Sequence, residues 1–251
     1  MLGVGGFAVL LAVAEAVPRL GLVEPAHLPP ATEILGRLAQ EAAGAALWTA
    51  LGETLRSWAL GLGIAFAAAL AAGALIDSVP GLRAATASTI EFLRPIPSVA
   101  LIPLATLLYG AGIGSSLLLV IYASFWQVLI QVLYGVADVD PVARETARGY
   151  RFRRRAYLRH VVWPTALPYV MTGLRLAATV AFILAVTAEL VIGSPGLGRR
   201  IQTAQSGGAV TTVYALIVVA GLVGVAVNLA VRWLERRVLA WHPSVRGEVP
   251  R

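Results

Sequence analysis

The chain has 251 residues, of which 58% are hydrophobic and 13% are charged, and its formal net charge is +7. Soluble domains carry about 25% charged residues, so much of this chain's surface must contact lipid instead of water. Cysteine is absent, which excludes disulfides and thiolate metal sites. All 20 basic residues are arginine, which excludes a phosphate-binding loop because that loop needs a lysine. If ATP drives this protein, another chain holds it.

Several uncharged segments are long enough to cross a bilayer, which takes about 20 helical residues. The predicted spans are Trp58–Ile76, two within Pro95–Ala137, one in Val161–Thr187 and one in Ile201–Val231. Gly110–Gly114 predicts the turn that divides the second segment, and Arg175 is the only charge in Val161–Thr187. The arginines lie between these runs, which indicates membrane orientation and argues against nucleic-acid binding.

A sixth span is predicted over Val4–Val17, which is short and contains Glu15. A secretory signal is the alternative, but no positive charge precedes the apolar run as a signal normally requires. The following segment, Pro18–Ser57, contains an amphipathic stretch at Ala31–Glu41 that is typical of a helix lying at the membrane interface.

The predicted fold is an all-α, polytopic bundle of six transmembrane helices forming one domain over residues 1–251. Residues 1–45 hold the first span and an external interfacial segment, and 46–238 form the core with a loop at 138–163. Residues 239–251 form a tail. Thirteen arginines lie in one set of alternating loops and five in the other. Positively charged loops stay in the cytoplasm, so the loop, the tail and both termini are predicted to be cytoplasmic.

The loop at 138–163 carries the most local information. Asp140 is placed to cap a helix, Pro141 suits its first position, and Gly149 is a good terminator. A second helix is predicted over about Phe152–Val162. One interpretation is a solvated basic loop. The other is a docking element of two short helices, because a plain connector needs neither these caps nor Phe152 and Tyr157.

The loop resembles the coupling motif, often called the EAA loop, of permease subunits in bacterial ABC importers. The matching segments are Glu145-Thr-Ala147, Val161-Val-Trp-Pro164, Ala166-Leu-Pro168, Phe92-Leu-Arg-Pro-Ile-Pro97 and Gly196-Leu-Gly198. The resemblance is closest to the sulfonate, taurine and nitrate branch. Two departures stand out: the motif's glycine aligns with Arg151, and Thr146 replaces an alanine. These predict a shifted turn between the two coupling helices.

The resemblance implies a transport subunit without enzyme activity, in a bacterial cell membrane, with no cofactor of its own. Two permease subunits, here two copies of this chain, would form the pathway, and an external binding protein would deliver the solute. A dimer of ATP-binding subunits, which holds ATP and Mg, would dock on the loop. The residues expected to contact it are Glu145, Thr146, Ala147, Arg148, Gly149, Arg151, Phe152 and Tyr157. Sulfonates, taurine, nitrate, and vitamin or pyrimidine precursors are all open as solutes.

Candidates for the solute pathway are Arg94, Pro97, Arg175 and Glu189. Intramembrane arginines are costly and often functional. For Arg94, the alternative to solute contact is an ion pair with Glu91 in the same helix. For Arg175, the alternative is packing against a carboxylate or a carbonyl. The prolines near position 97 either kink the third span or unwind it along a cavity, where irregular backbone is tolerated.

Two other classes fit the sequence less well. A secondary transporter driven by an ion gradient needs ionisable residues deep in several spans, and Arg175 is nearly alone in that position. A membrane enzyme would need an acidic cluster for a metal, yet Asp138 and Asp140 form the only close carboxylate pair. The histidines lie in loops without metal-ligand spacing.

Overall fold

The computed structural model describes residues 2–24, 26–79 and 81–241, and every regular element in this part of the chain is a helix. The elements are α1 (Leu2–Arg19), α2 (Ala31–Ala43), α3 (Ala45–Ser78), α4 (Leu82–Leu93), the 3-10 helix η1 (Ser98–Leu101), α5 (Ile102–Tyr109), α6 (Ile113–Ala137), α7 (Pro141–Gly149), α8 (Arg154–Tyr157), the π-helix η2 (Leu158–Val162), α9 (Trp163–Ile192), α10 (Leu197–Ser206) and α11 (Val210–Val238). The predicted all-α class is confirmed.

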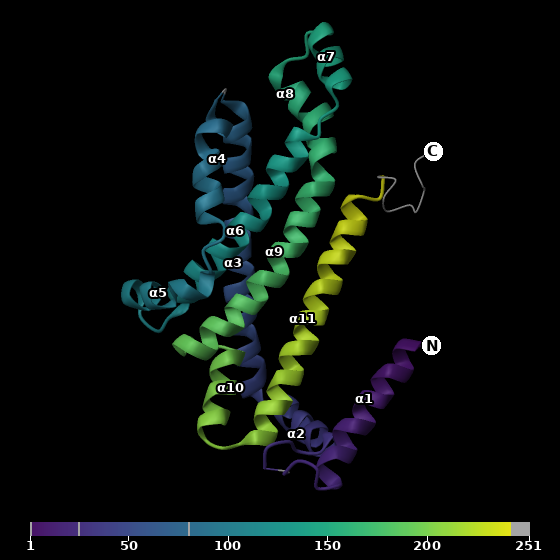
Figure 1. Cartoon of the computed structure of the whole chain (residues 1–251), viewed down its shortest axis with the longest axis vertical. Helices are drawn as coiled ribbons and strands as arrows, with labels where there is room; N and C mark the ends of the chain where they lie inside the picture. Colours follow the sequence, from purple (N-terminus) through teal and green to yellow (C-terminus); the bar gives the residue numbers. More distant parts are fainter. Residues whose placement is uncertain (1, 25, 80, 242–251) are drawn as a thin grey trace.

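The long helices α3, α6, α9 and α11 run along the long axis of the molecule (Figure 1). Helices α7 and α8 lie at one end of this bundle, and α2 and α10 lie at the other. The described residues contain four helices long and apolar enough to cross a membrane, or five if the bent pair of α4 with η1–α5 counts as one span. Helix α1 covers the predicted first span, whose crossing of the membrane stays a prediction, and the predicted tail lies outside the described residues from position 242 onward.

The third span differs from the prediction. The bent pair of α4 with η1–α5 occupies this part of the chain. If the pair is one span, it begins at Leu82, well before Pro95, and its two helices are bent by 81° across Arg94–Pro97. Arg83 and Glu91 hid the first half from a search for uncharged runs. The break follows from Pro95 and Pro97, which lack the N–H groups that would continue the helix.

The last span also begins later than predicted. Residues 197–206 form the separate helix α10, and α11 starts only at Val210. The two helices are separated by a turn in which Gly208 has φ +68°, a conformation that glycine adopts without steric cost. The prediction failed because this turn is as free of charge as the span that follows it.

Helices α6 and α9 pack more extensively than any other helix pair in the described chain. They approach closely at two glycines. A Cβ atom built on Gly135 would lie 2.9 Å from Ala166 Cα, and one on Gly173 would lie 3.2 Å from Val128 Cα. Small residues at such a crossing let the two backbones gain van der Waals contact, which drives helix association in lipid.

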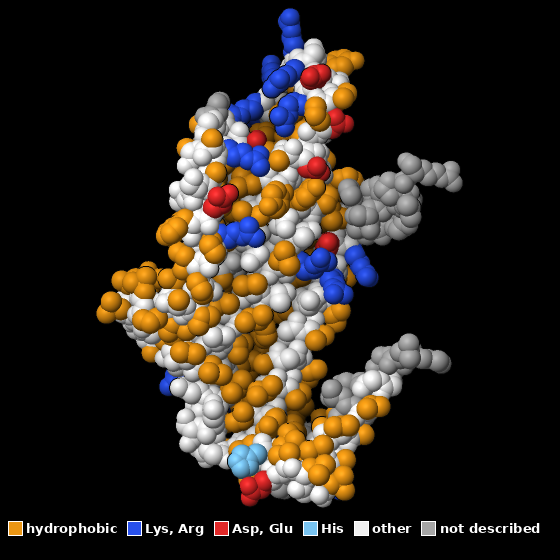
Figure 2. Space-filling view, viewed as in Figure 1, with side chains coloured by type: hydrophobic (Ala, Val, Ile, Leu, Met, Phe, Trp, Pro, Cys, Tyr) orange, Lys and Arg blue, Asp and Glu red, His pale blue; other side chains and the backbone are white. Residues whose placement is uncertain are grey.

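Charge is distributed unevenly over the molecule (Figure 2). On the face shown, arginine side chains gather around α7, α8 and the C-terminal end of α11, whereas hydrophobic side chains cover the middle of the bundle. This arrangement matches a membrane protein whose α7–α8 end lies outside the hydrocarbon layer.

The α6–α9 crossing generates a test. Replacing Gly135 with Val should destabilise the purified protein by about 1–3 kcal/mol, because the added carbons overpack a backbone contact. Gly63→Val is the matched control, since nothing lies within 4 Å of a Cβ atom at Gly63. Thermal unfolding in detergent would compare the two variants, and equal midpoints would contradict the assigned crossing.

Candidate functional site

The helix α7 begins as its sequence predicts. The Asp140 carboxylate accepts a hydrogen bond of 2.8 Å from the backbone N–H of Val142, and Pro141 occupies the first helical position. The cap satisfies one of the N–H groups that a helix start leaves without a partner. The cap therefore holds a nine-residue helix at the end of the bundle, outside the predicted spans.

The end of α7 corrects the expectation about its turn. Gly149 is the last helical residue, but the left-handed residue is Arg151, with φ +53°. The N–H of Phe152 donates to the Ala147 carbonyl and the N–H of Arg151 donates to the Arg148 carbonyl, both at 2.9 Å. This is the Schellman arrangement that usually ends in glycine. The turn thus stays at the position of the motif's glycine and is not shifted, although arginine occupies it.

The second helix of the loop also differs from the prediction. Only Arg154–Tyr157 is α-helical, and the π-helix Leu158–Val162 then continues without a break into α9. The segment predicted over Phe152–Val162 is thus mostly an N-terminal extension of α9.

The outward surface of the loop combines a carboxylate with large apolar side chains. Glu145 is exposed, and the exposed fractions of Val142, Tyr150 and Phe152 are 68%, 79% and 45%. Ala147 is buried beneath them, and Tyr157 packs partly buried against the main core. Thr146, Arg148, Gly149 and Arg151 are exposed. Sequence reasoning missed Val142 and Tyr150, which are unremarkable until the helix turns them outward.

The break in the third span lines a cavity of about 760 Å³ between α4 and α6. Its wall includes Arg94 and Pro97, two of the predicted pathway residues. Tyr122 donates a hydrogen bond of 2.6 Å to the Leu93 carbonyl, which Pro97 cannot reach as a donor and which also accepts the Ile96 N–H at 3.2 Å. Sequence reasoning missed the further polar lining residues Arg83, Glu91, Tyr122, Trp126 and Gln127. Their signal was a polar and aromatic stripe at helical spacing in an otherwise apolar span.

The other two predicted pathway residues lie elsewhere. Arg175 on α9 pairs with Glu235 on α11 at 3.4 Å, which is the carboxylate packing weighed from the sequence. Glu189 is fully buried at the opposite end of α9. Its carboxylate accepts hydrogen bonds from the Thr54 hydroxyl at 2.8 Å and the Gly198 N–H at 3.0 Å. Glu189 therefore joins α3 to the start of α10.

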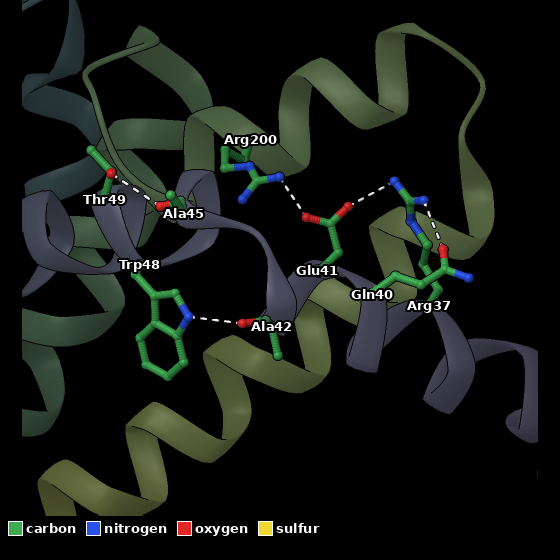
Figure 3. A network of polar contacts seen from close by, with 8 residues as sticks. All are labelled: Arg37, Gln40, Glu41, Ala42, Ala45, Trp48, Thr49 and Arg200. Atoms are coloured by element: carbon green, nitrogen blue, oxygen red, sulfur yellow. Dashed lines mark hydrogen bonds and ion pairs between the residues drawn. The ribbon is translucent and has the colours of Figure 1, made fainter.

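A second ionic network holds α2 against α10 (Figure 3). The buried Glu41 carboxylate pairs with Arg37, one turn earlier on α2, at 2.7 Å and with Arg200 on α10 at 2.5 Å. Trp48 donates from its ring nitrogen to the Ala42 carbonyl at 2.9 Å and closes the corner between α2 and α3. The interfacial helix is thus fixed to the core at the end opposite α7.

Within the described residues no group of three or more His, Cys, Asp or Glu could hold a metal ion.

Comparison with known proteins identifies the class. The family described as the binding-protein-dependent transport system inner membrane component matches residues 59–240, and the chain belongs to this family. The taurine transport system permease protein of Escherichia coli K12 is 34% identical over 98% of this chain and 91% of its own length. The putative aliphatic sulfonates transport permease protein of Bacillus subtilis 168 is 29% identical over 96% of this chain and 87% of its own length.

A further relative and a solved structure agree with this family assignment. The bicarbonate transport system permease protein of Synechococcus elongatus is 30% identical over 72% of this chain and 66% of its own length. An inward-facing MetNI methionine ABC transporter chain has a TM-score of 0.66 at 18% identity, covering 77% of this chain and 96% of that one, which shows the fold alone. The chain is thus a multi-pass permease subunit of an ABC importer, a transport component and not the ion-driven transporter weighed from composition.

The strained turn after α7 can be tested directly. Arg151→Gly should stabilise the turn by about 1 kcal/mol, because only glycine avoids the cost of the left-handed conformation. Hydrogen exchange of the amides at 147–153 would then slow several-fold. Gly149→Ala is the comparison, since it changes helix propensity but not the turn. Faster exchange in Arg151→Gly would show that the arginine side chain itself stabilises the turn.

Proposed function

We propose that this chain lines half of the pathway of an importer for a small anionic solute and that α7 is the docking element for a separate ATPase subunit in the cytoplasm. The observation that carries the docking role is the exposed surface of α7. Glu145 is exposed there, and so are the large apolar side chains of Val142 on the same helix and of Tyr150 and Phe152 just after it. Exposed apolar patches rimmed by polar groups mark interaction sites on proteins.

The connections of α7 support a mechanical role. One end joins α6 and the other leads through α8 and η2 into α9. Because α6 and α9 are packed tightly at Gly135 and Gly173, a movement of α7 by its partner would displace both helices together. Such a transition is a rigid-body rotation of a helix bundle about an interface.

The cavity at the broken helix supports an anionic solute. Its lining includes two arginines, Arg83 and Arg94, and one carboxylate, Glu91, so its net charge is positive. Relatives are named for taurine, aliphatic sulfonates and bicarbonate, which are small molecules with anionic oxygens. A guanidinium recognises such groups through paired hydrogen bonds. Selection among these solutes would rest largely with the binding protein.

A second copy of the chain is proposed to close this cavity. None of the twelve residues of α4, all of them described, is buried, and Phe92 is 73% exposed. Leu82 and Ile90 pack partly buried against the main core, so it is the rest of this helix that needs a partner or lipid. Pairing of two α4 helices would place two cavities face to face, as a pathway between two permease subunits requires. We also propose that α7 and both termini face the cytoplasm, because arginine-rich loops stay on that side of a membrane.

Glu145→Arg should abolish ATP-dependent uptake and prevent co-purification of the ATPase subunit, because it reverses the charge at the centre of the docking surface. The protein should still insert and unfold at the normal temperature. Glu24→Arg, an exposed reversal at the other end of the bundle, is the control and should retain the ATPase subunit. Normal ATPase capture by Glu145→Arg would remove α7 as the docking element.

Arg94→Gln should lower uptake of a small sulfonate such as taurine by about tenfold in proteoliposomes, because one charge-assisted hydrogen bond contributes about 1.5–3 kcal/mol. Arg94→Lys should restore part of the uptake. ATPase capture serves as the control, since neither change touches α7. Unchanged uptake in Arg94→Gln would exclude this arginine from the pathway.

A further inference from the structure

A second groove lies on a different side of α6 from the cavity at the broken helix. It has a volume of about 640 Å³ and lies among α3, α6 and the continuous segment α8–η2–α9. The small exposed residues Ala71 and Ala74 of α3 leave room for it, and Val132, Ala166 and Val170 form its apolar wall. The groove is therefore an apolar slot at the side of the bundle, in the half nearest α7.

The rim of this slot is charged. Arg155 and Arg159 are one helical turn apart and so project from the same side of the segment that enters α9. Both are exposed, and within residues 2–24, 26–79 and 81–241 neither side chain has a hydrogen bond or an ion pair. Asp77 at the end of α3 is the carboxylate on the rim, which leaves a net positive charge there.

The position of the rim relative to the bilayer follows from the helix geometry. Trp163 also lines the groove and is 47% exposed, as is typical of the aromatic belt at a membrane interface. At 1.5 Å per residue, Arg159 lies about 6 Å and Arg155 about 12 Å beyond it, at the level of lipid headgroups. From Arg159 to Val170 the slot runs roughly 16 Å, close to the thickness of one leaflet's hydrocarbon layer.

We propose that this groove is a binding site for an anionic phospholipid, with one acyl chain in the slot and the phosphate held by Arg155 and Arg159. The site is separate from the solute pathway and does not depend on the identity of the solute. Basic pockets between transmembrane helices bind anionic headgroups in this way. Asp77 would accept hydrogen bonds from headgroup hydroxyls, which phosphatidylglycerol provides.

The charge of the rim favours lipid over a second copy of the chain. A second copy would bring the same arginine-rich end against Arg155 and Arg159, whereas a phosphodiester neutralises them. The π-helix η2, a form frequently found at functional sites, lies along the slot, and its residues Leu158 and Val162 line the wall. A lipid held here would brace the segment through which α7 is connected to α9.

Native mass spectrometry of the full-length protein, taken from nanodiscs of phosphatidylglycerol or phosphatidylcholine, tests the site. The wild type should retain one phosphatidylglycerol and release phosphatidylcholine. The double variant Arg155→Gln, Arg159→Gln should lose at least tenfold of this retention. The control Arg153→Gln, Arg154→Gln removes the same charge from the same loop, outside the groove, and should retain the lipid. Equal retention by all three proteins, or equal loss in both double variants, would overturn the proposal.

The source of the phosphate is tested by filling the slot. Ala74→Phe should displace the acyl chain and reduce retention like the arginine double variant. Retention unchanged in Ala74→Phe, or competition by millimolar inorganic phosphate, would mean that the arginines hold a free phosphate and would overturn the lipid site.

Because the chain has no cysteine, Ala74→Cys introduces a single thiol that can report contact between two chains. Efficient cross-linking of two chains through this cysteine would assign the groove to a second copy instead.

Discussion

The close crossing of α6 and α9 is the constraint on which the rest of the structure depends. Gly135 and Gly173 leave no room for a side chain of their own, because backbone and Cβ atoms of the facing helix already occupy the position that a Cβ atom would take. Any larger residue separates the helices, and in lipid no hydrophobic force would bring them back together. Since α7 is connected to one helix of this pair and α8 continues into the other, the crossing makes the loop and the bundle one mechanical unit.

Breaks in the backbone are tolerated only where their polar groups find partners, because the hydrocarbon layer offers none. At the bend of the third span, the Tyr122 hydroxyl satisfies the Leu93 carbonyl. At the next turn the Ser115 hydroxyl lies within hydrogen-bond distance of the carbonyls of Ala105 and Gly110, which share its single proton. The cavity next to α4 lies beside the first break, and Arg94, Pro95, Ile96 and Pro97 of the break line it.

The sequence predicted helix caps and turns correctly where the interactions that form them involve only a few neighbouring residues. Asp140 and Pro141 define the start of α7 because a cap needs only the next two N–H groups. The turn at Gly110 interrupts an uncharged run as expected, with φ +66°. The start of α11 was misplaced because a search for charge-free runs cannot detect a turn at Gly208. Arg151 was misread because sequence favours glycine in a left-handed turn, whereas the paired hydrogen bonds of the helix end impose the conformation on whatever residue stands there.

The sequence by itself determined the membrane class, the resemblance to importer permeases and the helical loop with its caps, since these depend on composition and near neighbours. Only the tertiary structure decided which polar side chains meet. Arg175 pairs with Glu235, which is 60 residues away in the sequence. Thr54 bonds to Glu189 across 135 residues, and Glu41 pairs with Arg200 across 159 residues. The cavity at α4 and the groove beside η2 likewise exist only after distant helices pack. Helical periodicity fixes the face on which a side chain lies, but only the packed bundle determines what that face meets.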